Sequence, residues 1–419
     1  MYYKILATEN TEEDEFMNSI GNWRSNNTEY SRRFLIICLI ILCVLCGRSL
    51  SQDWKAVADG VEHAQVRREF SGKPVDINLL RLDLKKVRLD VHHAMDAAIG
   101  TEKTSSIATR HGAFAAINAG FFRLDKSIWT GEAAGLLKID GVLLSESVND
   151  RIALGIDNGE KKTAVLFDQL IYRKAFAYND ISKVFDGVNR EPRQKEMILF
   201  TPKTRTPADT QTRVEIILEE CSLFCKKVTV NENRGNTIVP ERGYAVVFGQ
   251  GADTEYIVEY FKNSANAERK FPTFVFDSVQ VARRAGYVDD KFRKKVEDIT
   301  NGVPQLIKNG KIDITWEQEK ASKSFVETRH PRTAVAKLKD GKFLMLTADG
   351  RSDASAGLDL YDLAKYMLEL GAVDAMNLDG GGSTTMFLDG KVVNKPSDKE
   401  GERKIGDAIL VTLRKPKRK

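Results

Sequence analysis

Hydrophobic and polar residues alternate along several parts of the chain, and this period of two is typical of β-strands with one buried face. Over residues 75–92 the pattern predicts two strands with a bend near Lys85-Lys86. The pairs Asp140-Gly141, Asn158-Gly159 and Asp389-Gly390 each lie between two apolar runs, where such pairs predict hairpin turns. The sequence therefore predicts repeated antiparallel pairing.

The clearest helical pattern covers residues 358–370, with Ser355 as the expected cap and Gly371 as the expected end. Its apolar stripe consists of Leu360, Leu363, Ala364, Met367 and Leu368. A shorter helix is predicted at 104–111, and buried strands are predicted at 113–118 and 373–378. Together these elements predict an α+β fold, mainly antiparallel β-sheet with a few packed helices, in a single large domain.

Residues Phe34–Cys46 form an unbroken apolar run that follows Arg32-Arg33. A membrane-spanning helix needs about 20 apolar residues, so this shorter run better fits a secretory signal, with an uncleaved anchor as the alternative. We expect cleavage after Ser51, and translation can start at Met1 or at Met17. The predicted organisation is an N-terminal extension, 1–51, and one domain, 52–419, whose middle section at about 160–300 is elaborated.

Export to the periplasm, the extracellular space or the cell surface is therefore expected, with membrane contact only through residues 34–46. Three of the five cysteines lie inside the apolar run. Cys221 and Cys225 remain, and in an oxidising compartment they either form a local disulfide or stay as two thiols. No CxxC pair and no dense cluster of His and Cys indicates a zinc site.

The composition excludes two classes of protein. With 42% hydrophobic and 8% aromatic residues, the chain can bury a substantial core, so global disorder is excluded. Its 64 Lys and Arg exceed its 59 Asp and Glu by five, and apart from the tail at 414–419 these charges are spread along the chain. Because nucleic-acid binders concentrate basic charge in a patch, no nucleic-acid partner is expected.

The strongest chemical signal is the segment 377–385, in which three glycines directly follow a predicted buried strand. Gly380, Gly381 and Gly382 would let the backbone approach a ligand closely, and their amide groups can form an anion-binding nest. The side chains of Asn377, Asp379, Ser383 and Thr384 add a carboxylate, hydroxyls and an amide. A simple tight hairpin is the alternative, but a hairpin needs fewer glycines.

Two further segments bring guanidinium groups close to the ends of predicted strands. Arg332 can fork onto two oxygens of a phosphate, and His330 is either a proton carrier or a structural residue. Asp349 and Arg351 follow another strand and offer a carboxylate and a second guanidinium, although they can also form an ordinary turn.

Asn118 closes a predicted buried strand and is followed by Gly120. A buried amide is costly unless it is hydrogen-bonded. Asn118 is therefore expected to orient a carboxylate, to touch substrate or to latch the turn.

Seven segments occur in the order of the phosphodiester glycosidase family: INAGFF, GLLKIDG, NGVPQLIKNGK, HPRTAVA, ADGR…SAG, GAVDAMNLDGGGST and NKPSDKEGERKIGDAI. The chain resembles this family over most of 60–415, most densely over 300–410. The family pattern carries over to Asn118, Gly120, Arg332, Asp349, Arg351, Asn377, Asp379, Gly380, Gly381, Gly382 and Ser383. Two positions depart from it: Ala119 stands where a second glycine is usual, and Asp407 stands where Asn is expected.

The resemblance implies an exported glycoside hydrolase that cleaves the anomeric bond of a sugar 1-phosphodiester, N-acetylglucosamine-type or related. The substrate would be this phosphodiester or another anionic glycan. In this hypothesis Asp379 faces the sugar with Asp349 as second choice, while Arg332 and the glycine turn bind phosphate, aided by Ser383 and Thr384. Asn118 and Asn377 would orient the carboxylates or bind hydroxyls, and Arg351 would bind the phosphate or hold Asp349.

Two alternatives from other classes stay open. A metal-dependent phosphodiester hydrolase would hold a divalent cation between Asp349 and Asp379. A non-catalytic module for anionic cell-surface glycan would use the glycine turn without a working carboxylate. The hypothesis of a glycosidase requires no cofactor, although a divalent cation is possible.

Overall fold

The computed structural model describes residues 52–178, 181–207, 212–221, 225–232, 235–252, 259, 273–281 and 296–415. The chain divides into Met1–Asp53 and Trp54–Lys419, and the second unit is described below. The predicted signal or anchor at 34–46 lies outside the described residues. Within the described ranges, no helix has both the length and the apolar character needed to cross a membrane.

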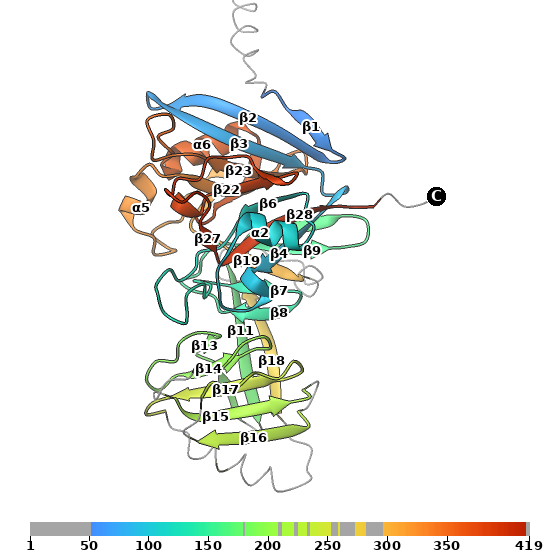
Figure 1. Cartoon of the computed structure of the whole chain (residues 1–419), viewed down its shortest axis with the longest axis vertical. Helices are drawn as coiled ribbons and strands as arrows, with labels where there is room; N and C mark the ends of the chain where they lie inside the picture. The colour runs from blue at the N-terminus through green and yellow to red at the C-terminus, as the bar shows by residue number, and fades with distance from the viewer. Residues whose placement is uncertain are drawn as a thin grey trace, which may run out of the picture. The chain divides into compact units, whose positions relative to one another are not determined.

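An antiparallel sheet of eight strands is the largest element of this unit, with the order β1-β2-β3-β23-β22-β24-β20-β21 (Figure 1). Helices α5 (Lys323–Glu327) and α6 (Leu360–Glu369) pack on one of its faces. The strands are β1 (Lys55–Ala58), β2 (Val61–Phe70), β3 (Lys73–Leu82), β20 (Gln305–Lys308), β21 (Lys311–Ile312), β22 (Arg332–Leu338), β23 (Phe343–Ala348) and β24 (Ala372–Asn377).

A second sheet, with the order β26-β25-β6-β28-β4, packs against the other face. Its strands are β4 (Val87–His93), β6 (Ala115–Asn118), β25 (Met386–Leu388), β26 (Lys391–Val392) and β28 (Asp407–Leu413). Helix α2 (Thr104–Arg110) covers its outer side through a small apolar cluster, beside the short pair β5 (Glu102–Lys103) and β27 (Lys404–Ile405). The 3₁₀ turns η1 (Ala94–Asp96) and η2 (Gly381–Ser383) complete this part.

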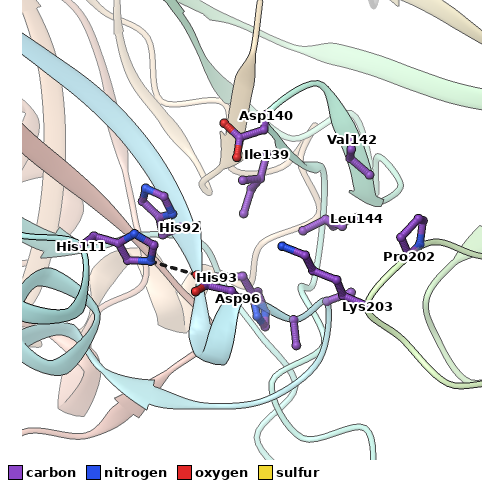
Figure 2. Close-up of a pocket in the computed structure, with 12 residues that line it drawn as sticks. His92, His93, Asp96, His111, Ile139, Asp140, Val142, Leu144, Pro202 and Lys203 are labelled. Atoms are coloured by element: carbon purple, nitrogen blue, oxygen red, sulfur yellow. Dashed lines mark hydrogen bonds and ion pairs between the residues drawn. The ribbon is translucent and has the colours of Figure 1, made fainter. Parts of the chain in front are cut away.

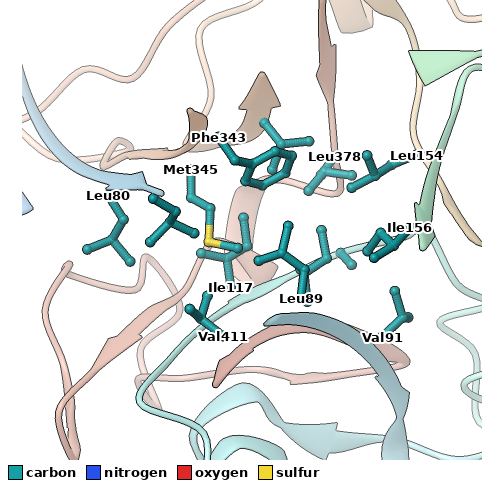
Figure 3. Close-up of a cluster of buried hydrophobic side chains, with 14 of the residues drawn as sticks. Leu80, Leu89, Val91, Ile117, Leu154, Ile156, Phe343, Met345, Leu378 and Val411 are labelled. Atoms are coloured by element: carbon teal, nitrogen blue, oxygen red, sulfur yellow. The ribbon is translucent and has the colours of Figure 1, made fainter. Parts of the chain in front are cut away.

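The alternation of side chains along the strands divides the core into two layers. Leu79 and Leu346 pack with α6, whereas their neighbours Leu80 and Met345 pack against the second sheet. Successive residues of a strand point to opposite faces, so one sheet supplies both layers. Figure 3 shows the layer between the two sheets, where Leu80, Phe343 and Met345 meet Leu89, Ile117 and Val411.

The middle of the chain forms three further sheets, β10-β9-β19-β7-β8, β12-β11-β18 and β13-β14-β17-β15-β16, in which only the short β13–β14 pair is parallel among the described strands. Their strands are β7 (Leu137–Ile139), β8 (Val142–Ser145), β9 (Ala153–Asn158), β10 (Thr163–Asp168), β11 (Leu170–Tyr178), β12 (Ile181–Val184), β13 (Gly187–Val188), β14 (Met197–Phe200), β15 (Thr212–Glu219), β16 (Lys227–Glu232), β17 (Tyr244–Gly249), β18 (Thr273–Val281) and β19 (Asp298–Asn301).

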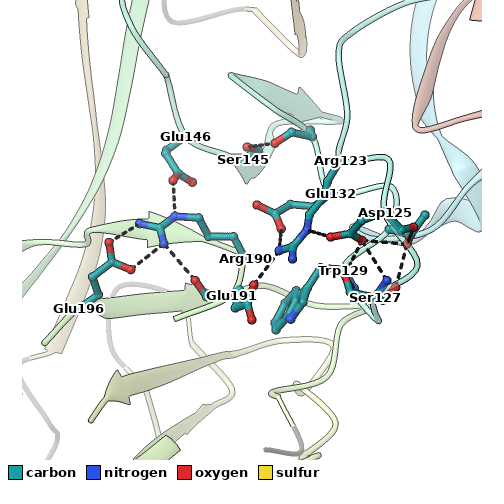
Figure 4. Close-up of polar contacts among 12 residues, drawn as sticks. Arg123, Asp125, Ser127, Trp129, Glu132, Ser145, Glu146, Arg190, Glu191 and Glu196 are labelled. Carbon is teal, nitrogen blue, oxygen red and sulfur yellow. Dashed lines mark hydrogen bonds and ion pairs between the residues drawn. The ribbon is translucent and has the colours of Figure 1, made fainter. Parts of the chain in front are cut away.

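Ion pairs join this middle section to the chain that precedes it (Figure 4). Arg190 contacts Glu146 and Glu196, each at 2.7 Å, and its side chain is only 15% exposed. Arg123 pairs with Glu191 at 2.8 Å. Because Arg190 is mostly buried, its pairs are screened less than those of an exposed arginine.

The structure confirms the predicted fold class and most of the predicted elements. The expected helix at 358–370 forms as α6, and Gly371 follows it with a φ of 89°. The predicted cap is wrong, because Asp359 rather than Ser355 accepts the hydrogen bond from the first turn. The hydroxyl of Ser355 instead donates to the carbonyl of Asp349. Cys221 and Cys225, for which two states were open, form a disulfide.

Candidate active site

The predicted site residues gather where the ends of several strands meet. Arg332 begins β22 and is in register with Ala348 at the end of β23, while Ala334 is in register with Asn377 at the end of β24. In an antiparallel sheet the start of one strand lies beside the ends of its neighbours. The loops after β23 and β24 therefore leave the sheet side by side.

Asn118 connects this edge to the second sheet and is fully buried. Its side-chain amide donates to the carbonyl of Asp379 at 2.6 Å, and its oxygen accepts from the hydroxyl of Thr333 and the amide of Thr385. All of these partners belong to the protein. Of the three roles expected for Asn118, latching the turn is the one that its contacts support.

Asp379 lies at the base of the glycine turn and keeps part of its surface exposed. Burial of the carboxyl raises its pKa to about 6, opposed by the Ser383 hydroxyl, the Gly380 amide and the charge of Arg403. Such an acid changes charge in the pH range where many enzymes work, which is a property of catalytic carboxyls.

The glycine turn does not present its amides as the predicted nest. The amide of Gly380 donates to Asp379 Oδ1 at 2.9 Å, and the amide of Gly381 donates to the carbonyl of Pro331 at 2.8 Å. Two of the expected donors are thus bonded within the protein. The turn holds the carboxylate of Asp379 instead of offering these amides to an anion.

Two arginines approach this glycine turn closely. A Cβ atom at Gly381, whose φ is +62°, would lie 2.8 Å from Arg351 Nη2, and one at Gly382 would lie 2.1 Å from Arg403 Nη2. Arg351 is exposed, whereas Arg403 is held by Asp398 at 2.7 and 3.0 Å. Two guanidinium groups therefore flank the turn that carries Asp379: that of Arg351 is exposed, with one long contact of 3.5 Å to the Ser397 hydroxyl, and that of Arg403 is anchored by Asp398.

Arg403 and Asp398 were not assigned a role from the sequence. Both lie in the segment NKPSDKEGERKIGDAI, one of the segments that resemble the family. The resemblance therefore indicated this segment but gave these two residues no role. Their proximity to Gly382 could not be read from spacing, because they come from a separate loop.

Arg332 has a different environment from the one expected. Its side chain is 1% exposed, its Nε donates to the carbonyl of Leu358, and its Nη2 donates to the carbonyls of Phe325 and Thr328. Burial lowers its pKa to about 10. These contacts do not support the prediction that this guanidinium binds phosphate, because they direct it toward the loop around α5.

His330 and Asp349 lie beside these groups. His330 is partly exposed, and burial, together with the charges of Arg332 and Arg351, lowers the pKa of its ring. The Nδ1 of His330 has no hydrogen-bond partner in the described structure. Asp349 is 8% exposed, and its carboxylate accepts from the amides of Lys395 and the Asn394 side chain. Asp349 thus positions the 394–395 segment.

The remaining predicted residues are buried around the turn. Asn377 donates to the carbonyls of Val303 and Leu378, and both Asn377 and Ser383 are fully buried. Thr384 is also buried, and its hydroxyl has no hydrogen-bond partner among the described residues. Asn377, Ser383 and Thr384 therefore pack inside the protein next to the turn and do not face an open surface.

Asp407, the position that departs from the family pattern, lies under Gly120. Its Oδ1 accepts from the amide of Gly120 at 2.9 Å and its Oδ2 accepts from the hydroxyl of Thr300 at 2.7 Å. A Cβ at Gly120 would lie 3.0–3.2 Å from Asp407, Asn301 and Thr300, which explains the glycine. Burial raises the pKa of Asp407 to about 6, and its charge also raises the pKa of Asp379.

The sequence model described as phosphodiester glycosidase matches residues 227–412. Over this region the chain is similar to the phosphodiester glycosidase family. The region contains Arg332, Asp349, Arg351 and the glycine turn, whereas Asn118 precedes it. The resemblance seen in the sequence motifs is confirmed.

Among curated relatives of the phosphodiester glycosidase region is the mouse protein N-acetylglucosamine-1-phosphodiester alpha-N-acetylglucosaminidase. It is 37% identical over 110 residues, which cover 24% of this chain and 21% of the mouse protein. The chain thus aligns with about a fifth of the length of this relative.

Two solved structures share the fold over a larger part of the chain. A hypothetical protein from Synechocystis has a TM-score of 0.69 at 19% identity. The match covers 87% of this chain and 64% of the Synechocystis chain. A protein from Burkholderia pseudomallei K96243, named as a candidate for export, has a TM-score of 0.67 at 20% identity. The match covers 81% of this chain and 74% of the Burkholderia chain. At these identities the two structures bear on the fold alone.

Proposed function

We propose that the protein hydrolyses the anomeric C–O bond of a sugar 1-phosphodiester and releases a free sugar and a phosphomonoester. The observation that carries this proposal is the placement of an exposed guanidinium, Arg351, and a carboxyl, Asp379, around one glycine turn. The name of the mouse relative supports N-acetylglucosamine as the type of sugar.

In this proposal the carboxylate of Asp379 stabilises the positive charge that develops on the anomeric carbon. Glycosidases ordinarily use two carboxyl groups, one of which protonates the leaving group. The leaving group here is a phosphomonoester, which is weakly basic, so one carboxylate and a cation can replace the pair. The raised pKa of Asp379 fits this role if the reaction runs above pH 6, where the group is ionised.

Arg351 is the proposed phosphate ligand in place of Arg332. Its guanidinium is exposed and lies against Gly381, whereas the Nε and Nη2 of Arg332 donate to backbone carbonyls. A cation held at the departing oxygens stabilises the charge that accumulates there in the transition state. Arg403, fixed by Asp398, adds positive potential on the other side of the turn.

Hydrolysis of N-acetylglucosamine-1-phosphodiesters in ¹⁸O-labelled water tests which bond breaks. Cleavage of the anomeric C–O bond leaves the phosphomonoester without ¹⁸O, and mass spectrometry of the phosphorylated product measures this. Label in the phosphate would instead support a metal-dependent phosphodiester hydrolase and contradict the proposal.

Asp379→Asn separates catalysis from simple binding. We expect it to lower kcat at least about 100-fold, because the ionisable group is lost while size and shape are kept. Asp353→Asn, an exposed carboxyl in the nearby loop, is the matched control and should leave kcat unchanged. Equal turnover by Asp379→Asn and wild type would contradict the assignment.

Export is the second part of this proposal. It is supported by the apolar run 34–46 behind Arg32-Arg33 and by the Cys221–Cys225 disulfide, since disulfides persist in oxidising compartments. Sequencing of the N-terminus of the protein recovered outside the cytosol tests it. A new N-terminus after Ser51 is expected, and retention of the whole chain in the cytosol would contradict export.

A further inference from the structure

A cavity of about 300 Å³ lies outside the candidate active site, and histidines line one end of it. His92 comes from the end of β4, Asp96 from η1, and His111 directly follows α2. Figure 2 shows these three side chains together at one end, with the amine of Lys203 reaching in from another segment. None of them belongs to the family motifs.

The geometry points to a site for a divalent transition-metal ion of the Zn²⁺ class, formed by His92, Asp96 and His111. One ligand atom of each residue lies within 4.8 Å of those of the other two, and among the described residues this is the group that meets that condition. Asp349 and Asp379, the pair considered for a cation from the sequence, are not part of it.

For His111 and Asp96 the distance between the ligand atoms leaves little to rearrange on binding. His111 Nε2 and Asp96 Oδ1 are 2.9 Å apart. Two ligands on a tetrahedral zinc ion, each about 2.0–2.1 Å from the metal, are separated by about 3.3 Å. An ion can therefore replace the proton shared by these atoms after a shift of a few tenths of an ångström. His92 and His111 stack with centroids 3.7 Å apart and 23° between the rings, so the second imidazole is adjacent. His92 must turn out of this stack before the in-plane lone pairs of both rings can point to one ion.

The ligand types indicate which ion would bind. Two imidazoles and one carboxylate suit Zn²⁺ and its neighbours in the first transition row, whereas Mg²⁺ and Ca²⁺ prefer oxygen alone. The three protein ligands leave one position open toward the cavity, as in zinc sites that bind a water or a small ligand.

Charges of both signs surround the proposed metal site. Arg110 contacts the second oxygen of Asp96 and is itself paired with Glu102 at 2.8 Å. It therefore orients the carboxylate and leaves Oδ1 for the metal, as groups behind metal ligands commonly do. Its Nη1 also lies 3.0 Å from His111 Nε2, a contact that an ion bound to this nitrogen would replace. The negative charges of Asp90 and Asp140 act on His92, while Lys203 is a cation on the cavity wall.

The backbone also holds Asp96 in this position. Met95 and Asp96 have φ values of 59° and 52°, a left-handed conformation that costs free energy for residues other than glycine. Through this turn Asp96 reaches His111, which follows α2, and His92 on β4. A bound ion would tie three separate segments together and stabilise the fold.

Titration of the full chain, prepared without a histidine tag, with Zn²⁺ by calorimetry tests the site. We expect one ion per chain and a rise in Tm. His92→Ala and His111→Ala should each weaken binding at least about 10-fold. His63→Ala, a partly buried histidine on β2, is the matched control and should bind as wild type does. Absence of saturable binding, or equal binding by all three variants, would overturn the proposal.

A measurement on the wild-type chain keeps the test decisive if the variants fold poorly. Hydrogen exchange at the C2 position of each imidazole, read by mass spectrometry, follows the five histidines separately. Zn²⁺ should slow exchange at His92 and His111 and leave His63 unchanged. Protection of none of the histidines, or of His63 alone, would contradict the site.

Discussion

Arg332 and Arg351 show how the environment of a residue decides its role. Both lie at strand ends beside the glycine turn, yet one is buried among backbone carbonyls and the other is exposed. The two positions should therefore fail in different ways when they are replaced.

We expect Arg351→Ala to reduce kcat/KM for a sugar 1-phosphodiester about 100-fold and to leave stability unchanged, since a single stabilising donor is worth about this much. Arg332→Met should instead lower the free energy of unfolding by about 2–4 kcal/mol, because three carbonyls lose their donor in a buried place. Steady-state kinetics and urea unfolding of both variants distinguish these outcomes. A loss of activity without loss of stability in Arg332→Met, together with normal activity in Arg351→Ala, would instead support Arg332 as the phosphate ligand.

Asp407 makes stability depend on pH. Its pKa in the fold, about 6, is above the ordinary value of 3.8, so folding favours the protonated form. The resulting stability is present below about pH 4 and is lost as the pH rises through 6. Asp407→Asn removes this loss. We expect the variant to gain up to about 3 kcal/mol relative to wild type between pH 4 and pH 8, measured by chemical unfolding.

The same substitution should also change activity. Asp407 raises the pKa of Asp379, so Asp407→Asn should move the acidic limb of the kcat/KM profile to lower pH. Asp353→Asn serves as the exposed control. Identical profiles for wild type and Asp407→Asn would show that the two carboxyls do not interact.

At the scale of elements, α6 depends on a cap that the sequence did not single out. Asp359 Oδ1 accepts from the amide of Asp362 at 2.8 Å. We expect Asp359→Ala to lower the free energy of unfolding by about 1 kcal/mol and Asp359→Asn to change it little, because Asn also caps well. Thermal unfolding of both variants checks this. If both substitutions lower the stability equally, the ion pair between Asp359 and Arg329, and not the helix cap, explains the loss.

Much of the element pattern could be predicted because it depends on local signals. The apolar stripe of α6, the alternation in β3 and β4 and the turn at Asp389-Gly390 each lie within a few residues. The choice between Ser355 and Asp359 as the cap could not be predicted, since it depends on the backbone atoms of Asp349 and Asp76 that engage Ser355.

The sequence pointed to residues that lie close together in the fold, but it could not predict their contacts. Asp379 and the glycines stand out in the sequence, and the structure places them at the edge where the strands end. The burial of Arg332 and the approach of Arg403 depend on loops distant in sequence. For the same reason, the spacing of His92, Asp96 and His111 contains no recognisable metal motif.

At the scale of the whole molecule, the middle section is joined to the preceding chain partly through Arg190. Removing the cation leaves Glu146 and Glu196 without a mostly buried partner, which typically costs several kcal/mol. We expect Arg190→Met to increase amide hydrogen exchange in β14 and β17 more than in β22 and β23. Hydrogen-exchange mass spectrometry measures both regions, and Lys226→Met, which removes an exposed pair with Glu220, is the control.

Uniform loss of protection in all four strands would show that the middle section and the eight-stranded sheet unfold as one cooperative unit. A local loss would show that they have separate stabilities.

The pairing of β11 with β18 has a consequence for the history of the protein. These strands run side by side from Leu170 opposite Val281 to Tyr178 opposite Thr273, so the chain departs from and returns to neighbouring positions. A genetic insertion or deletion between these points leaves the register of the eight-stranded sheet untouched. Recombination can therefore exchange this segment, and its diversification need not disturb the carboxylate and arginines around the glycine turn.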